Sequence, residues 1–126
     1  MNKEIATEWC TLLESGEFQQ GRERLVRPEG YCCLGVLCEL YRRTTGLGTW
    51  AAPENSRPGH LKQFIIEGEQ GITALPHSVM KWAGLKSTNG FYKDEVYGNA
   101  NLAAHNDLGK SFVEISQIIK ERVDVL

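Results

Sequence analysis

The sequence predicts a small α+β fold, mainly helical, with four to five helices and short antiparallel hairpins. Three long segments carry apolar residues at helical spacing, and the short apolar runs between them are bounded by glycine and proline. The chain has 126 residues, of which 41% are hydrophobic and 24% charged, a length and composition typical of one globular domain. We therefore expect a single domain over residues 1–126.

Three helices are predicted from apolar stripes. The first covers residues 3–15 and ends at Gly16, because glycine readily adopts the left-handed conformation at a helix C-terminus. The second covers residues 33–45 and has the most apolar face of the chain. The last begins at Ser111, which forms a capping-box pattern with Glu114 three residues later.

A hairpin and a loop are predicted around the second helix. Residues 17–30 contain too many glycines and prolines for a helix, and Phe18 and Leu25-Val26 favour two short strands. Residues 49–62 contain two prolines and a glycine close together, a composition that prevents regular structure, so this segment is expected to be a loop.

Shorter elements are predicted in the second half of the chain. Residues 64–66 form a strand, and residues 72–74 are its expected hairpin partner. A short helix begins with Pro76 as its first residue and ends at Ala83, before a glycine. Residues 86–97 are expected to be a loop with one edge strand, after which Asn99 caps another short helix.

Composition limits the classes of partner. The net charge of −2 argues against duplex nucleic acid as a partner, because such proteins need an excess of basic residues. The first residues lack a basic and then apolar leader, and no apolar run approaches the roughly 20 residues that span a bilayer. The sequence therefore predicts a cytoplasmic protein without membrane contact, and it leaves a homo-oligomer open.

The four cysteines are expected to be reduced core residues. Three of them, Cys32, Cys33 and Cys38, lie in the most apolar stretch of the chain, where thiols behave as small hydrophobic side chains. A zinc site made of these three and a histidine is disfavoured. On a helix Cys33 and Cys38 point about 140° apart, which disperses the ligands.

Catalytic groups are difficult to assemble from this sequence. A cysteine nucleophile with His105 and Asn106 or Asp107 needs groups that converge, whereas neighbours on a helix point about 100° apart. Glu67 and Glu69 are better interpreted as a solvated turn than as a carboxylate pair. The glycines form no phosphate-binding loop. From these observations together with the cysteine spacing, we predict no catalytic residue, metal or cofactor.

The arginines are unevenly distributed. Six of the seven lie between residues 22 and 57, and residues 20–62 carry a net charge of +3 while the remainder carries −5. Guanidinium groups bind phosphate oxygens in pairs and stack on bases, and a nearby tryptophan adds a stacking surface. If residues 22–25 form a strand, Arg22 and Arg24 share a face. The candidate ligand-binding residues are Arg22, Arg24, Arg27, Trp50 and Arg57. The alternative is a solvated surface with local ion pairs.

Four stretches of the chain form a distinctive set. The most distinctive begins with Tyr-Cys-Cys-Leu-Gly-Val-Leu-Cys at residues 31–38 and continues through Glu39-Leu40. The others are Trp9 with residues 13–21, Leu75-Pro76 with Trp82-Ala83-Gly84, and Asn-Asp-Leu-Gly-Lys-Ser-Phe at residues 106–112 with Glu114-Ile115. Together they resemble a family of small uncharacterised proteins common in phage genomes and prophages. The resemblance implies a protein made in a bacterium by a virus or its remnant, but no activity.

Three functions are compatible with these observations. The resemblance and the arginines favour a phage accessory protein that counters host defence by binding, with sequestration of a nucleotide-type, phosphate-bearing signal as the specific form. The second is a protein-interaction inhibitor of a host defence or nucleic-acid enzyme. The third is a small cysteine-dependent enzyme.

Overall fold

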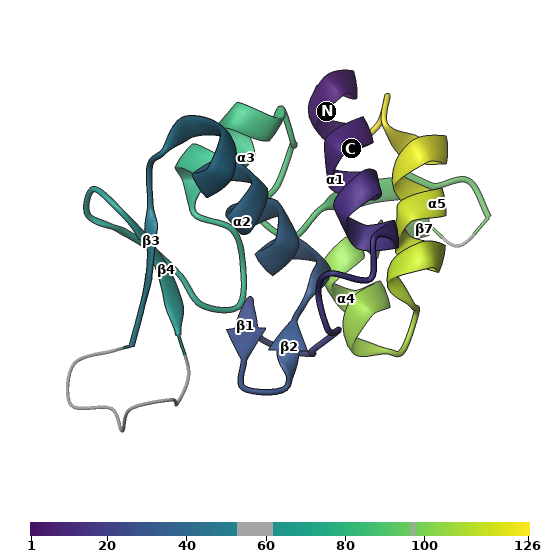
Figure 1. Ribbon diagram of the computed structural model, residues 1–126. Helices are drawn as coiled ribbons and strands as arrows, with labels where there is room; N and C mark the ends of the chain where they lie inside the picture. The colour runs from purple at the N-terminus through teal and green to yellow at the C-terminus, as the bar shows by residue number, and fades with distance from the viewer. Residues whose placement is uncertain (53–61, 97) are drawn as a thin grey trace.

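Helix α2 (Cys33–Thr45) runs through the middle of the protein in this computed structural model, which describes residues 1–52, 62–96 and 98–126 (Figure 1). Every residue of α2 from 33 to 41 is buried. The other elements are α1 (Lys3–Glu14), β1 (Val26–Arg27), β2 (Gly30–Tyr31), β3 (Thr49–Ala51), β4 (Gln63–Ile66), β5 (Glu69–Gly71), α3 (His77–Ala83), β6 (Phe91–Asp94), β7 (Gly98–Asn101), α4 (Leu102–Asp107) and α5 (Phe112–Arg122).

The helices pack around α2, and the strands form small sheets at the periphery. Helices α1 and α5 lie side by side on one side of α2, and α3 lies on the other side, toward the β3–β4 strands (Figure 1). The strands of the described part pair antiparallel with one another, as β1–β2, β3–β4–β5 and β6–β7, and Tyr31 of β2 also forms an isolated parallel bridge with Gln20. The predicted α+β class, with four to five helices and short antiparallel hairpins, is therefore confirmed, since the described residues contain five helices and short antiparallel sheets.

The core lies between α2 and the helices beside it. Trp9 is fully buried, and its indole N–H donates to the carbonyl of Cys33 over 2.9 Å, which joins α1 to the start of α2. Ile115 and Ile119 of α5 are also fully buried, as the predicted stripe requires. No helix in the described ranges has the length and apolar character needed to cross a membrane.

The long helices agree with their apolar periodicity. Helix α2 has the predicted bounds, and α1 ends at Glu14, one residue before the predicted end. The capping box of α5 is present in full, since Ser111 Oγ accepts from Glu114 N and Glu114 Oε1 accepts from Ser111 N, both over 3.1 Å.

The first hairpin pairs different residues from those predicted. Phe18 is not in a strand, and Val26–Arg27 pairs instead with Gly30–Tyr31 across a two-residue turn. The predicted strand at residues 22–25 is also wrong, because β1 begins at Val26. Short-range pairing across the Pro28-Glu29 turn needs less chain ordering than pairing with the distant Phe18.

The second sheet contains two corrections. Residues 49–51 form strand β3 rather than loop, while the prolines of that segment lie outside the described residues. The partner of β4 is β5 at residues 69–71, not residues 72–74. Glu67 and Gly68 both have positive φ, at 21° and 80°, so they form a tight two-residue connection that pairs Ile66 with Glu69.

The short C-terminal elements also differ from the prediction. Residues 86–101 contain a hairpin of two strands, β6 and β7, rather than one edge strand. Asn101 caps α4 by accepting from Ala104 N over 2.7 Å, and Asn99, the predicted cap, lies in β7. Pro76 is the N-cap residue of α3, one position before the helix that it was expected to begin.

Candidate functional site

A groove of about 420 Å³ lies between the chain segment after α1 and the β1–β2 hairpin. Its two sides are joined by the backbone, since Tyr31 N donates to Gln19 O over 2.8 Å. The approach requires glycine at position 30, because a Cβ there would lie 2.2 Å from Gln19 O. The groove is lined by Glu17, Phe18, Gln19, Val26, Arg27, Pro28, Glu29, Gly30, Tyr31 and Lys62.

Aromatic rings form part of the wall of this groove. Phe18 and Tyr31 meet edge to face with their centroids 5.0 Å apart. Behind them Trp50 contacts Tyr31 edge-on at 5.8 Å and Phe64 at 4.8 Å. The ring of Tyr31 is therefore held in place from two sides, and it offers a rigid surface to a flat ligand.

The charged side chains of the groove are not equally engaged. Arg27 Nη2 donates to Glu23 Oε2 over 2.9 Å, while the Nε of Arg27 is buried without a hydrogen-bond partner in the described part of the chain. Lys62 is exposed at the groove. Of the two acids in the lining, Glu17 is bound by Arg43, which neutralises it. Among the described residues the groove thus offers one cation without an ion pair, Lys62, a second, Arg27, that is paired with Glu23, and one unneutralised acid, Glu29.

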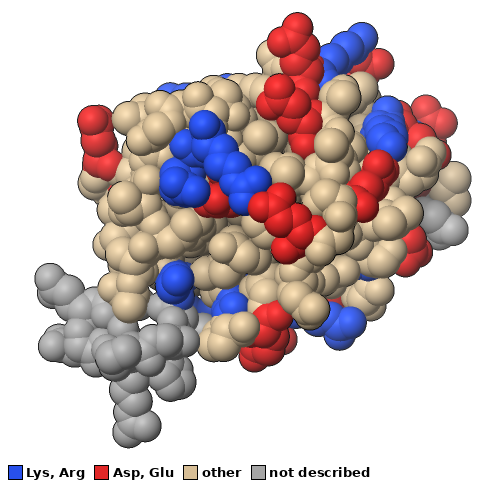
Figure 2. Space-filling model, in the orientation of Figure 1, with Lys and Arg blue, Asp and Glu red and all other residues tan. Residues whose placement is uncertain are grey.

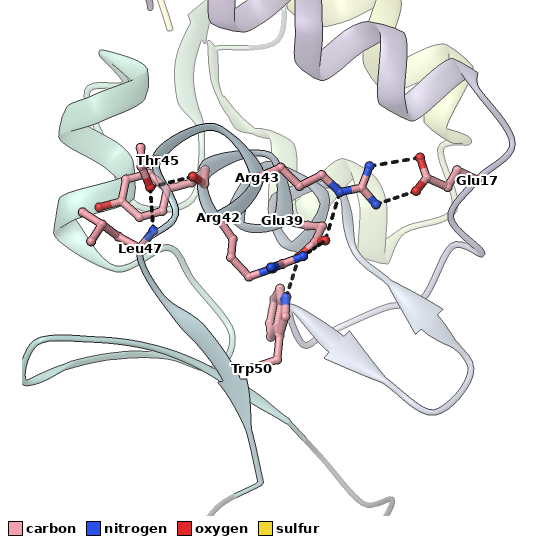
Figure 3. A network of polar contacts seen from close by, with 8 residues as sticks. Glu17, Glu39, Arg42, Arg43, Thr45, Leu47 and Trp50 are labelled. Atoms are coloured by element: carbon pink, nitrogen blue, oxygen red, sulfur yellow. Dashed lines mark hydrogen bonds and ion pairs between the residues drawn. The ribbon is translucent and has the colours of Figure 1, made fainter.

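A second charged cluster lies beside the groove and surrounds Glu39 (Figure 3). Arg42 donates to both oxygens of the Glu39 carboxylate, over 2.7 and 2.8 Å, and Arg43 Nε donates to one of them over 3.0 Å. The indole N–H of Trp50 adds a bond of 3.1 Å. Basic side chains stand directly beside acidic ones in the middle of the face drawn in Figure 2. Arg42 and Arg43 are therefore engaged within the protein and less available to a ligand.

The Glu39 cluster sets a testable dependence of stability on pH. Hydrogen bonds from Arg42 above all, and from Trp50 and Arg43, lower the pKa of Glu39 to about 2. Because the pKa is lowered on folding, this stabilisation is complete above about pH 5 and is lost as the pH falls toward 2. We expect Glu39→Gln to lower the free energy of unfolding by about 2 kcal/mol at pH 7.

The measurement is urea unfolding of the wild type and of Glu39→Gln at pH 7, 5 and 3. The difference between the two should shrink at the lowest pH, whereas Glu8→Gln, at an exposed position of α1, should leave the stability within about 0.5 kcal/mol at each pH. A constant difference across these pH values would contradict an ionised, hydrogen-bonded Glu39.

The structure brings together only some of the ligand-binding residues that were predicted from the sequence. Arg27 lines the groove, and Trp50 supports its wall from behind rather than presenting a free stacking face. Arg22 is exposed and its guanidinium lies beside Gly109, away from the groove lining. Arg24 is half-buried, and neither Arg22 nor Arg24 forms a hydrogen bond or ion pair with a described residue. Arg57 lies outside the described residues.

Comparison with known proteins identifies the family. A family model described as "Domain of unknown function (DUF8296)" matches residues 1–123. The chain belongs to the DUF8296 family. Searches of curated proteins and of solved structures yield no match.

In this DUF8296 chain a buried asparagine holds the loop of residues 20–23, which connects the two sides of the groove. Asn106 is fully buried, and its Oδ1 accepts from Gln20 Nε2 over 2.9 Å and from Cys33 N over 3.1 Å. Its Nδ2 donates to Gly21 O over 2.8 Å. The neighbouring Asp107 accepts from Glu23 N over 2.7 Å. These contacts tie α4 to residues 20–23 and to the start of α2.

This polar network was not predicted from the sequence, which indicated only that residues 106–109 end one helix and lead to the next. The signal that could have revealed it is an Asn-Asp pair at the end of a short helix that begins Leu-Ala-Ala, because a buried amide needs several partners. Tyr31 was missed for a similar reason. It was counted with the apolar stretch that follows it, although it precedes the helix.

The thiols of the DUF8296 chain lie in the core. All four cysteines are free and buried, as expected from their apolar surroundings. Burial raises the pKa of Cys32 to about 11 and the pKa of Cys33 and Cys38 well above the ordinary value, which suppresses the thiolate. His105 is half-buried, and its Nε2 lies 2.7 Å from Tyr92 Oη rather than near a thiol.

The described residues also contain no group of three or more histidine, cysteine, aspartate or glutamate side chains placed to hold a metal ion. Within these residues Ser78 N, at the start of α3, donates a hydrogen bond to Glu69 Oε1 over 3.2 Å. The Glu69 carboxylate is therefore bound to α3 and does not form a carboxylate pair with Glu67.

Proposed function

We propose that this protein acts by binding, and that it sequesters a phosphate-bearing small molecule of nucleotide type in the groove beside the β1–β2 hairpin. The observation that carries the proposal is the combination of an aromatic wall with a cationic edge in one groove. Phe18 and Tyr31 offer stacking surface to a base, and Arg27 and Lys62 offer charge to a phosphate. The volume of about 420 Å³ lies in the range of small-molecule sites.

The resemblance to small phage and prophage proteins supports a role for such binding in countering host defence. A protein that removes a signalling molecule of host defence from solution needs affinity and burial but no catalytic group. The engaged side chains around the groove fit this role, since they fix its shape before a ligand arrives. Arg22 and Arg24 extend the positive surface along the preceding loop, where they attract an anion without being in the groove lining.

A protein partner is the second candidate, and one observation favours it. Leu108 and Val113 expose 86% and 62% of their surface where α4 leads into α5. Both side chains are available to the apolar centre of a protein interface. An inhibitor of a host enzyme would use this surface and would bind no small ligand.

The proposal predicts a loss of ligand binding when Arg27 is removed. Thermal unfolding of the wild type against mono-, di- and cyclic nucleotides should reveal a selective ligand, because a ligand at 100 times its Kd stabilises by about 2.7 kcal/mol. For this ligand, calorimetric titration should show affinity reduced about 30-fold or more in Arg27→Ala, since a charge-assisted pair of hydrogen bonds is lost.

Arg22→Ala is the matched control. It removes the same charge from an exposed side chain beside Gly109, so we expect an affinity change below about threefold. Equal losses in the two variants would place the anion elsewhere. The absence of any nucleotide-dependent shift in the wild type would reject the proposal in favour of the protein partner.

A further inference from the structure

Two arginines in this protein use the same edge of the guanidinium differently. Arg42 donates from Nε and Nη2 to the two oxygens of Glu39, so its edge is completely filled. Arg27 donates from Nη2 to a single oxygen of Glu23, and its buried Nε has no acceptor in the described part of the chain. The edge of Arg27 is therefore half-filled, although the guanidinium belongs to a residue that lines the groove.

The contact between Glu23 and Arg27 depends on an unusual backbone conformation. Glu23 has φ of 69°, in the left-handed region that residues with a side chain rarely adopt. Its N–H donates to Asp107 Oδ1 over 2.7 Å, and this bond holds the strained residue in place. The carboxylate of Glu23 is thus positioned next to Arg27 by a contact with α4, a distant part of the chain.

The side chain of Glu23 is also easy to displace. It is 70% exposed, so its carboxylate can return to water with little loss, whereas the side chain of Arg27 is only 32% exposed. A phosphate group carries more charge than a carboxylate and has three oxygens that can fill both donors of one guanidinium edge.

Resting on the proposed function, we propose that Glu23 is an internal stand-in for the phosphate of the ligand. In the free protein its carboxylate occupies Nη2 of Arg27, and the incoming phosphate displaces it and bonds to both Nε and Nη2. The groove then selects phosphate-bearing ligands, because a singly charged anion gains little by replacing a carboxylate that is already present. Glu23 lowers the affinity of the site and raises its selectivity.

The test compares Glu23→Gln with Glu29→Gln. Each variant removes one negative charge near the groove and keeps the shape of the side chain. Glu29 lines the groove but forms no ion pair or hydrogen bond with another described residue, so only Glu23→Gln weakens a competitor for Arg27. The probes are ATP and inorganic pyrophosphate, titrated calorimetrically into the full chain at constant ionic strength, with acetate as the singly charged comparison.

We expect both phosphate probes to bind Glu29→Gln up to about twofold more tightly than the wild type, because the groove loses one negative charge. Glu23→Gln should gain about threefold to fivefold, because it loses the same charge and also weakens the competitor for Nη2 of Arg27. Acetate should bind measurably only to Glu23→Gln. An affinity of Glu23→Gln no higher than that of Glu29→Gln would reject the stand-in while leaving the proposed function intact, provided that Arg27→Ala still reduces affinity about 30-fold or more. If neither probe binds the wild type or Glu23→Gln, the stand-in is rejected, and the proposed function fails with it when the nucleotide panel also produces no thermal shift.

Discussion

Replacing Asn106 with alanine is expected to lower the free energy of unfolding by about 3–5 kcal/mol. The substitution leaves the N–H of Cys33, the amide of Gln20 and the carbonyl of Gly21 without their present partner, and the first of these is a buried donor at the start of α2. Each unsatisfied buried group costs about 1–3 kcal/mol, and the cavity adds to this. Thermal unfolding should show a decrease in Tm on the order of 10–20 °C.

Asn99→Ala is the control for this prediction. Asn99 is exposed in β7, and its side chain forms no hydrogen bond with another described residue, so its removal should change stability by less than about 0.5 kcal/mol. Asn106→Asp tests the geometry more finely. The carboxylate cannot donate to Gly21 O, whereas its protonated form can, so the loss relative to the wild type should become smaller as the pH falls. A small effect of Asn106→Ala would mean that water replaces these bonds.

The long helices could be predicted from the sequence because their signals are local. The stripe of α2 and the capping box at Ser111 involve residues that lie within one or two helical turns of each other. The hairpins could not be predicted as well. Their register depends on turn conformation, and nothing in the side chain of Glu67 indicates that its φ is positive.

The candidate site shows a similar division. Glu39 lies three and four residues before Arg42 and Arg43, a spacing that already indicates ion pairs along a helix, so their engagement was accessible from the sequence. The hydrogen bond from Arg43 to Glu17 joins residues 26 positions apart, and the sequence contains no indication of it. Likewise, no pattern indicated that Trp50 would stand behind Tyr31. Pairings over long separations depend on how the elements pack, and a single sequence carries no periodic signal for them.

The loop before β1 illustrates why the local charge pattern was informative but incomplete. Alternating arginines at residues 22 and 24 were expected to share one face of a strand, but this segment is irregular and is held by Asp107 through Glu23. The excess of arginine in this part of the chain is a property of the sequence. The conformation of the loop that carries Arg22 and Arg24 depends on its contact with α4. The proposed anion site therefore depends on a contact between the first and last thirds of the chain, the bond from Glu23 N to Asp107.

Replacing Gly35 with alanine should destabilise the protein by more than about 3 kcal/mol, although helix propensity alone predicts a gain of about 1 kcal/mol. A Cβ at this position would lie 1.9 Å from the carbonyl oxygen of Leu25, which is backbone and cannot rotate away. The same oxygen accepts from Cys32 N over 3.1 Å at the start of α2, so moving it also breaks a contact at the helix N-terminus.

Gly46→Ala separates this steric effect from the general cost of replacing a glycine. Gly46 ends α2 with φ of 73° and has open space where a Cβ would lie, so alanine there should cost about 1 kcal/mol through backbone strain alone. Urea unfolding of both variants shows whether the steric clash or the helix propensity determines the change in the free energy of unfolding. If Gly35→Ala were as stable as the wild type, Leu25 and α2 could not be in contact as described, and the hairpin that forms one side of the groove would have to lie elsewhere, because Leu25 directly precedes β1.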